Sequence, residues 1–246
     1  MSFKISIITI CRNIATTIER TLKSIVNQSF QNFEWIVIDG NSNDGTYEIL
    51  QKYESRINTL IHEPDSGIYN AMNKGIKKAH GEYLLFLNGG DELFDNESLL
   101  IASQYLSNYL LVIFDIHLKN NNGIVEWKVP HKIDLYPGSI PHNGTFIARN
   151  LFLKYGLYNE TFKICADHEF FTRIIEKHKV KYIVHNRFIS IFHLDGISIT
   201  QKLLTEKEDN RIRKKYYPLR YFLDNHFFWK KVFCKLFPHY FDYLSN

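Results

Sequence analysis

Cysteine is scarce in this sequence, and its spacing excludes two common uses of the residue. The 246 residues include only three cysteines, Cys11, Cys165 and Cys234. An odd number of widely separated cysteines provides neither the paired spacing of a zinc site nor the framework of a small disulfide-bonded protein. A reducing compartment is the simplest setting for such a chain, so we expect a cytoplasmic protein.

Long apolar runs are also missing. The run from Ile5 to Cys11 has seven residues and is flanked by Lys4 and Arg12. It is too short for a signal peptide or a membrane-spanning helix, and we expect a buried strand there. Because 45% of the residues are hydrophobic and 15% are aromatic, the chain is able to bury the core of one large domain.

Glycines are absent from the places where two kinds of nucleotide site need them. A dinucleotide-binding fold has a G-x-G-x-x-G motif directly after its first strand, whereas the first glycine here is Gly40. A P-loop contains the tripeptide G-K-S or G-K-T, and neither occurs. These absences exclude dehydrogenases, epimerases and P-loop NTPases. They also exclude nucleotidyltransferases with a glycine-rich signature after the first strand.

Positive charge is concentrated at the C-terminal end. Residues 201–246 carry ten Lys or Arg and five Asp or Glu, so they account for the net charge of +4. Twelve of the 28 residues from Tyr216 to Tyr243 are aromatic. Such a segment suits an anionic membrane surface, and it equally suits a pair of C-terminal helices packed on the core. No RNA-binding signature is present, so we expect no nucleic-acid partner.

Segments with the apolar pattern of helices alternate with segments typical of strands in the first half of the chain. Apolar residues recur at helical spacing in residues 16–28 and 67–79. Around them lie four short, nearly apolar segments that are typical of strands covered on both faces: Lys4–Ile10, Phe33–Asp39, Ile57–Glu63 and Glu82–Asn88. The alternation predicts βαβ units and an α/β fold whose mainly parallel, Rossmann-like sheet is flanked by helices.

Past residue 108 the pattern is less regular. We expect a hairpin whose turn is KNNNG (residues 119–123), then a long loop over residues 130–146. A helix is predicted at Ala166–Lys177, followed by strands at residues 180–184 and 187–192. We interpret the charged residues 203–215 as a polar crossing into the tail.

Polar residues follow each strand-like segment of the first half. The sequences are CRN, DGNSNDGT, HEPDSGIYNAMNKG and NGGDE, in chain order. Ligands of parallel α/β sheets bind beyond the carboxyl ends of the strands. We therefore expect these residues to gather at one edge of the sheet and to form the functional site.

Four longer segments make the pattern specific. SIITICRN, QSFQNFEWIVIDGNSNDGT, EPDSGIYNAMNKGIKKAHGEYLLFLNGGD and HNGTFIARNLFLKYGLYNETFKICADHEFFTRI occur in this order between Phe3 and Thr200. They resemble the family 2 inverting glycosyltransferases of GT-A fold, most closely the bacterial branch that builds surface polysaccharides. The resemblance implies a GT-A domain in residues 1–200, with a nucleotide-binding half (1–107) and an acceptor-side half (108–200). A basic, aromatic C-terminal extension (201–246) follows.

The same resemblance implies a reaction. A sugar would pass from a nucleotide-diphosphate sugar, such as a UDP-sugar, to a hydroxyl of a glycan or lipid-linked acceptor with inversion. The cofactor would be Mn²⁺ or Mg²⁺, and the product an O-antigen, capsule or exopolysaccharide. A lipid-linked acceptor would suit a peripheral enzyme at the cytoplasmic face of the inner membrane. The alternative is a relative that binds a sugar nucleotide or polysaccharide without catalysis.

The resemblance also assigns the nucleotide site. It implies that these residues bind the base, the nucleotide and the phosphates: Thr9, Arg12, Asp39, Asp65, Gly67 and Lys74. Ordinary alternatives exist, namely a tight turn at Asp39, a helix cap and a surface ion pair. For Asp44, capping the helix that begins near Thr46 explains the residue as well as a functional role does.

The family's acidic metal signature is reduced here to one residue. Asn88 and Gly90 stand where acids are common, and we count them with the donor-binding residues. Asp91 remains, and Mg²⁺ or Mn²⁺ often takes only one or two oxygen ligands from the protein. His193 is a candidate second ligand, although a histidine at a strand end also serves structure. The missing acids are the only support for the non-catalytic alternative.

The candidate catalytic base is Asp167, which opens a predicted helix in CADHEFFTRI. The resemblance implies that Asp167 accepts the proton of the acceptor hydroxyl. The alternative is a structural role, because the helix dipole alone would also favour a carboxylate there. Glu169 is the reserve candidate and is expected to point elsewhere. His142 and Asn143 are expected to approach the donor sugar or the acceptor, unless they belong to an ordinary polar loop.

Overall fold

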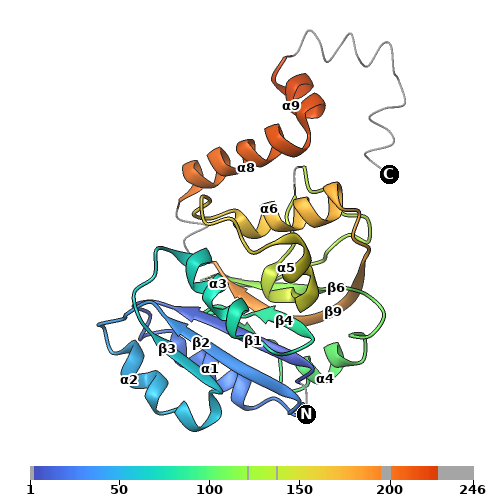
Figure 1. Ribbon diagram of the computed structural model, residues 1–246. Coiled ribbons are helices and arrows are strands. Elements are labelled where there is room, and N and C mark those ends of the chain that lie inside the picture. The colour runs from blue at the N-terminus through green and yellow to red at the C-terminus, as the bar shows by residue number, and fades with distance from the viewer. Residues whose placement is uncertain (1–2, 121, 137, 195–200, 227–246) are drawn as a thin grey trace.

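The computed structural model of the protein describes residues 3–120, 122–136, 138–194 and 201–226. Its strands form one sheet in the order β3-β2-β1-β4-β8-β6-β9-β5, with β7 paired to β6. Figure 1 shows this sheet in the middle of the molecule, with helices on both sides. The α/β fold predicted from the alternating pattern is therefore confirmed.

The first half of the chain forms the parallel part of the sheet. Its strands are β1 (Ile5–Cys11), β2 (Phe33–Asp39), β3 (Thr59–His62) and β4 (Tyr83–Phe86). The connections contain α1 (Ile18–Val26), α2 (Thr46–Gln51), the 3-10 turn η1 (Glu54–Arg56) and α3 (Ile68–Lys78). All residues of β1 and β4 are buried, since helices cover both faces of the sheet.

The second half of the sheet is mixed and adds antiparallel strands to the parallel half. Its strands are β5 (Glu92–Leu93), β6 (Leu111–Asn120), β7 (Gly123–Trp127), β8 (Thr145–Ala148) and β9 (Tyr182–His193). β8 runs antiparallel between β4 and β6, and β6 and β7 form the predicted hairpin. The two strands expected after residue 180 are one strand, because the irregularity between them is a bulge opposite Asp115.

Two helices differ from the expectations. The helix predicted at Ala166–Lys177 is α6 (Ala166–Thr172) continued by a π-helical turn, η3 (Arg173–Lys177). The charged residues interpreted as a polar crossing belong instead to the long helix α8 (Lys202–Tyr216). Its apolar pattern is weak because Glu208 and Ile212 are its only buried residues. The other helices are α4 (Ser98–Ser103), the 3-10 turn η2 (His142–Gly144), α5 (Arg149–Tyr155) and α9 (Pro218–Asn225).

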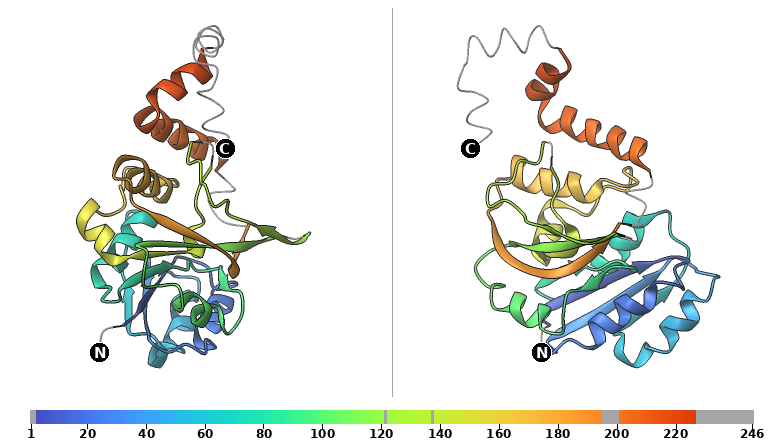
Figure 2. Two further views of the ribbon diagram at one scale, coloured as in Figure 1. Left: turned by 90° about the vertical axis from the view of Figure 1, so that its right-hand side faces the viewer. Right: turned by 180° about the vertical axis from the view of Figure 1, so that it is seen from behind.

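The helices lie in layers around the sheet. α1 and α2 cover one face, and α3, α5 and α6 lie on the other (Figures 1 and 2). α8 lies outside α6 and leads to α9, so the described part of the C-terminal extension is a helix pair. The aromatic residues from Phe227 to Tyr243 lie outside the described residues. Within the described parts, no helix is long and apolar enough to cross a membrane.

A buried glutamate ties the strands together at their amino ends, opposite the candidate site. Glu34 is 3% exposed. Its Oε1 accepts hydrogen bonds from Ser6 Oγ at 2.5 Å, His80 N at 2.5 Å and Gly81 N at 2.9 Å. Gly81 allows this approach, since a Cβ there would lie 2.6 Å from the backbone N of Ser6. The carboxylate thereby connects β1, β2 and the turn before β4.

Replacing Glu34 by alanine leaves these buried donors without an acceptor. We predict that Glu34→Ala lowers the free energy of unfolding by about 2–4 kcal/mol, measured by urea denaturation. The exposed Glu48 is the matched control, and Glu48→Ala should change stability by less than about 0.5 kcal/mol. Equal stabilities of the two variants would contradict this role of Glu34.

Candidate active site

A cavity of about 1010 Å³ opens at the carboxyl ends of β1 and β4, where the strand-end residues were expected to gather. This volume is at the upper end of the range for small-molecule sites. The first half of the chain contributes the residues after β1, β3 and β4, and the second half contributes η2, the start of α6 and the end of β9. The cavity therefore lies between the two halves of the sheet.

Three of the expected nucleotide-site residues line this cavity. They are Arg12, Asp65 and Gly67. Asp65 Oδ1 accepts a hydrogen bond from Gly67 N at 2.9 Å, which fixes the loop before α3. Arg12 and Asp65 meet above Gly40, where an added Cβ would collide with Asp65 Oδ2. A side chain at residue 40 would therefore displace the Asp65 carboxylate.

Asp39 and Thr9 are close to the cavity but are absent from its wall. Asp39 is fully buried, and its carboxylate is occupied by Ser42 N at 3.0 Å, by the Ser42 hydroxyl and by His62 Nδ1 at 2.5 Å. Thr9 is also fully buried, and its Oγ1 accepts a hydrogen bond from Trp35 Nε1 at 3.1 Å. Asp39 thus fixes the turn after β2, and Thr9 points into the core.

Lys74 and Asp44 hold loops together. Lys74 Nζ donates to the carbonyl oxygen of Pro64 at 2.7 Å and pairs with Glu63 at 2.8 Å, so it fastens the loop that carries Asp65. Asp44 accepts hydrogen bonds from Thr46 N and Ala15 N, both at 3.0 Å. These bonds lower the pKa of Asp44. Asp44 thus accepts the first amide of α2, although the N-cap residue itself is Gly45, and it also connects α2 to the loop after β1.

The turn after β4 is clamped by α1. Gly90 has φ of +104°, a conformation that favours glycine. Thr21 Oγ1 accepts from Gly90 N at 2.9 Å and donates to the carbonyl oxygen of Asp91 at 2.5 Å. Gly89 allows a close approach, because a Cβ there would collide with Ile14. The turn holds Asn88, Gly90 and Asp91 at the cavity wall.

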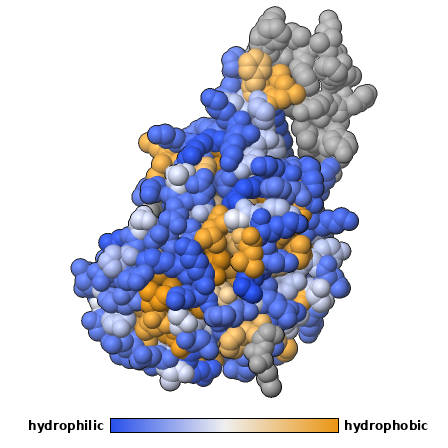
Figure 3. Space-filling model, in the orientation of Figure 1, coloured by the Kyte–Doolittle hydropathy of each residue, from blue (hydrophilic) through white to orange (hydrophobic). Residues whose placement is uncertain are grey.

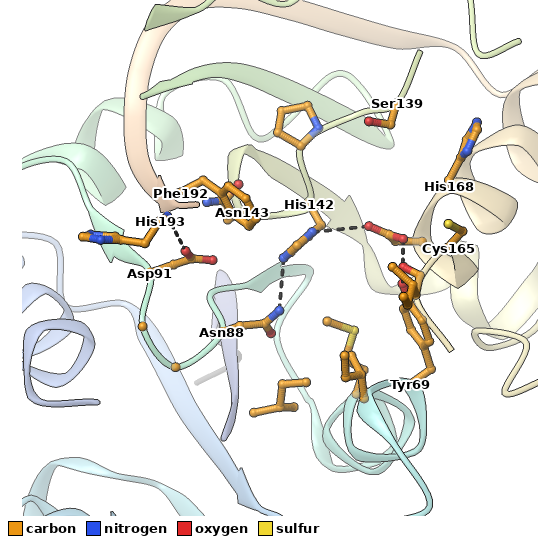
Figure 4. Close-up of a pocket in the computed structure, with 18 of the residues that line it drawn as sticks. Tyr69, Asn88, Asp91, Ser139, His142, Asn143, Cys165, His168, Phe192 and His193 are labelled. Carbon is orange, nitrogen blue, oxygen red and sulfur yellow. Dashed lines mark hydrogen bonds and ion pairs between the residues drawn. The ribbon is translucent and has the colours of Figure 1, made fainter. Parts of the chain in front are cut away.

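Asp91 faces the cavity, as the metal hypothesis requires. It is 6% exposed, and its Oδ1 accepts a hydrogen bond from His193 N at 3.0 Å. The imidazole of His193 has another partner, since Nε2 lies 2.9 Å from Glu92 Oε1. Figure 4 shows this ring directed away from Asp91. His193 therefore contacts Asp91 through its backbone. Glu92 is half-buried against the His193 ring.

A chain of four polar side chains that includes the candidate base crosses the cavity, and dashed lines mark its contacts in Figure 4. Asn88 Nδ2 lies 3.1 Å from His142 Nε2, and His142 Nδ1 lies 3.3 Å from Asp167 Oδ2. On its other oxygen, Asp167 accepts a hydrogen bond from Tyr69 Oη at 2.7 Å. The four residues come from the turn after β4, from η2, from α6 and from α3. His142 is thus part of the site, and Tyr69 is a member that the sequence interpretation missed.

The surroundings of Asp167 favour its ionised form. Burial by itself would raise the pKa of Asp167, but the hydrogen bond and charge of His142, with the Tyr69 hydroxyl, bring this pKa below its usual value. Burial would lower the pKa of His142, yet Asp167 and the charge of Asp91 raise it. The pair is therefore an imidazolium beside a carboxylate over a wider pH range than either group alone would allow. An ionised carboxylate in a cavity is suited to accept a proton.

Glu169 and Asn143 have different positions. Glu169 is buried and points to the far side of α6, where it pairs with Arg173 and with Lys215, both at 3.2 Å. The expectation that it points elsewhere is confirmed. Asn143 lines the cavity, and its Nδ2 is a buried donor without a partner among the described residues.

Sequence comparison places these residues in a known family. The sequence model of glycosyl transferase family 2 matches residues 6–174. The chain is 31% identical over 173 residues, 67% of each chain, to a PGL/p-HBAD biosynthesis glycosyltransferase of Mycobacterium bovis. It is 40% identical over 91 residues, 36% of each chain, to a putative teichuronic acid biosynthesis glycosyltransferase of Bacillus subtilis.

Solved structures give the same result for the fold. S. aureus TarS 1-349 in complex with UDP has a TM-score of 0.67 at 19% identity, covering 87% of this chain and 70% of that chain. The mannosyltransferase PcManGT from Pyrobaculum calidifontis in complex with GDP-Man and Mn²⁺ has a TM-score of 0.70 at 16% identity, covering 87% and 64%. Together with the family match, these likenesses lead to one conclusion: the chain is a glycosyltransferase of GT-A fold that belongs to glycosyl transferase family 2.

Proposed function

We propose that this glycosyltransferase transfers a sugar from a UDP-sugar to a hydroxyl of a glycan or lipid-linked acceptor, with inversion, in the synthesis of a bacterial surface polysaccharide. The observation that carries the proposal is the Asp167 carboxylate, which lines the cavity and is kept ionised by His142. Support for the donor comes from TarS, which was solved with UDP and with UDP-GlcNAc. Support for the pathway comes from the two bacterial relatives, whose names refer to PGL/p-HBAD and teichuronic acid biosynthesis.

The proposed chemistry is a single displacement. Asp167 accepts the proton of the acceptor hydroxyl while the hydroxyl oxygen forms a bond to the anomeric carbon. The bond between this carbon and the diphosphate oxygen breaks, and the nucleoside diphosphate leaves with the electron pair. Attack from the side opposite the leaving group inverts the anomeric configuration. The cavity walls align the two reactants.

A divalent metal ion fits the residues at the turn after β4. Asp91 provides a carboxylate, and Asn88 Oδ1 is a buried acceptor with no hydrogen-bond partner among the described residues. Both are oxygen donors, which Mg²⁺ and Mn²⁺ prefer. Groups of three or more His, Cys, Asp or Glu side chains suited to a metal are absent from the described residues. When bound, the ion would neutralise charge on the departing diphosphate.

The remaining polar residues divide between direct and indirect roles in this proposal. Arg12, Asp65 and Gly67 contact the nucleotide, since they line the cavity next to the metal turn. Asp39 fixes the neighbouring turn after β2, and Lys74 fastens the loop that carries Asp65 and Gly67. The backbone N–H of His193 orients Asp91, and its ring would have to leave Glu92 to become a metal ligand.

We also propose a peripheral position on the cytoplasmic face of the membrane. The support is α9, where Leu219 and Phe222 are 46% and 41% exposed, and where Figure 3 shows an apolar group at one end of the molecule. The last turn of the preceding helix α8 carries Arg213, Lys214 and Lys215. Exposed apolar groups beside cations suit an anionic lipid surface.

The function is tested by removing the base. We predict that Asp167→Asn lowers the rate of sugar transfer by about 10²–10⁴-fold, because an amide cannot take the acceptor proton. Transfer would be measured with purified protein, UDP-sugars, Mn²⁺ and a lipid-linked acceptor. The distant, exposed Glu54→Gln is the matched control and should keep full activity. Full activity of Asp167→Asn would refute the assignment.

The ion pair with His142 makes a prediction about pH. In the native protein, activity is lost as the pH falls through the lowered pKa of Asp167, because the base becomes protonated. His142→Ala removes the charge that lowers this pKa and leaves burial, which raises it. We therefore expect the acidic limb of the kcat profile to move to higher pH in the variant. An unmoved acidic limb would show that His142 does not set the protonation of the base.

The metal hypothesis is tested by nucleotide binding. We predict that Mn²⁺ tightens the binding of UDP to the native protein and that Asp91→Asn removes this gain, as measured by isothermal titration calorimetry. Asp95→Asn is the control, because Asp95 caps the turn before α4 outside the cavity. UDP binding that gains nothing from Mn²⁺ in the native protein, together with no turnover of any donor, would favour the non-catalytic alternative.

A further inference from the structure

A second carboxylate lies directly behind the candidate base. Glu208 belongs to α8 and is 7% exposed. Its Oε1 accepts a hydrogen bond from Lys163 N at 2.7 Å, and its Oε2 accepts from Ile164 N at 2.9 Å and Cys165 N at 3.0 Å. These are three successive backbone amides, and Asp167 follows two residues later. No Lys, Arg or His of the described residues forms an ion pair with Glu208.

The segment held by Glu208 is also held from the cavity side. Tyr69 Oη contacts both the carbonyl oxygen of Ile164 and the carboxylate of Asp167. The amide of Ile164 is thus bonded to Glu208, and its carbonyl to Tyr69. A shift of this segment would change the position of Asp167 relative to Tyr69 and His142.

The same helix holds the segment that leads to His142. Asp209 Oδ1 lies 2.9 Å from His168 Nδ1, and His168 Nε2 donates to the carbonyl oxygen of Leu135 at 2.8 Å. Arg213 Nε donates to the carbonyl oxygen of Tyr136 at 2.8 Å. α8 therefore contacts the chain segments that precede the two members of the ion pair, His142 and Asp167.

We propose that α8 contributes to the active site through Glu208, a positioning residue that holds the catalytic base in place. Glu208 does so by accepting hydrogen bonds from the backbone amides of residues 163–165. Buried carboxylates form strong, charge-assisted bonds to backbone N–H groups, and a base must be held in place to act efficiently. Glu208 lies beyond residues 6–174, where the family match ends. The inference rests on the proposed role of Asp167.

The test is Glu208→Gln in the full-length chain. One oxygen of the carboxylate becomes an NH₂ group, so at least one of the three amides loses its acceptor. We expect kcat to fall on the order of ten- to a hundred-fold with an unchanged KM for the donor. We also expect the acidic limb of the kcat profile to move to higher pH, because Asp167 leaves His142. Glu206→Gln, an exposed neighbour on the same helix, is the matched control and should behave as the native protein.

Hydrogen–deuterium exchange tests the same contacts independently of catalytic activity. The amides of Lys163, Ile164 and Cys165 should exchange faster in Glu208→Gln than in the native protein, while those of β1 stay protected. Unchanged exchange, or a lower kcat with an unmoved acidic limb, would overturn the positioning role. If Asp167→Asn is inactive and Glu208→Gln is fully active, the proposed function stands and this inference fails.

A second variant covers the case in which Glu208→Gln does not fold. Arg213→Ala removes the bond to the Tyr136 carbonyl from a half-buried position outside the cavity wall. It should lower kcat several-fold at an unchanged donor KM. Native kcat in this variant would overturn the role of α8 in holding the segment before His142.

Discussion

The ion pair between His142 and Asp167 is the interaction on which the rest of the site depends. It joins η2 to α6, and the hydrogen bonds of Asn88 and Tyr69 extend it to the turn after β4 and to α3. Four segments that are far apart in sequence are thereby fixed around one cavity. The pair also favours the ionised form of Asp167, since His142 offsets the effect of burial on the pKa of this carboxyl group.

The two halves of the sheet contribute different parts of this arrangement. The parallel half ends in loops that are bound to one another: Asp39 fixes the turn after β2, Lys74 the loop before α3, and Thr21 the turn that carries Asp91. The mixed half brings η2 and α6 across from these loops. The proposed transfer needs both halves, because Asp167 belongs to the second half and the turn with Asp91 belongs to the first.

Much of the fold could be predicted from the sequence, because apolar residues in the first half recur at clear strand and helix spacings. Apolar runs alternating with helical spacing predicted β1 to β4, α1 and α3, and the polar strand ends predicted the edge where the cavity lies. The mixed part of the sheet was not predictable in the same way. The antiparallel position of β8 depends on pairing between distant residues, and α8 lacks an apolar stripe because it is anchored mainly by Glu208 and Ile212.

For the site, the sequence predicted which residues lie there better than it predicted where their side chains point. Arg12, Asp65, Asn88, Asp91 and Asp167 all line the cavity, whereas Thr9, Asp39 and Lys74 support it from outside. Which way a side chain points depends on partners such as Trp35, Ser42 and Pro64, which local patterns do not show. Tyr69 and Glu208 were missed for the same reason, since each contacts α6 or the segment just before it from a distant helix.

The most direct test of the central claim is a carbon-13 NMR titration of the Asp167 carboxyl group in the folded protein, assigned by its absence from Asp167→Asn. The account predicts a pKa below that of an ordinary aspartate, because the charge of His142 outweighs burial. A pKa at or above the ordinary value would contradict the account, since burial alone would then govern the carboxyl group that is proposed to act as the base.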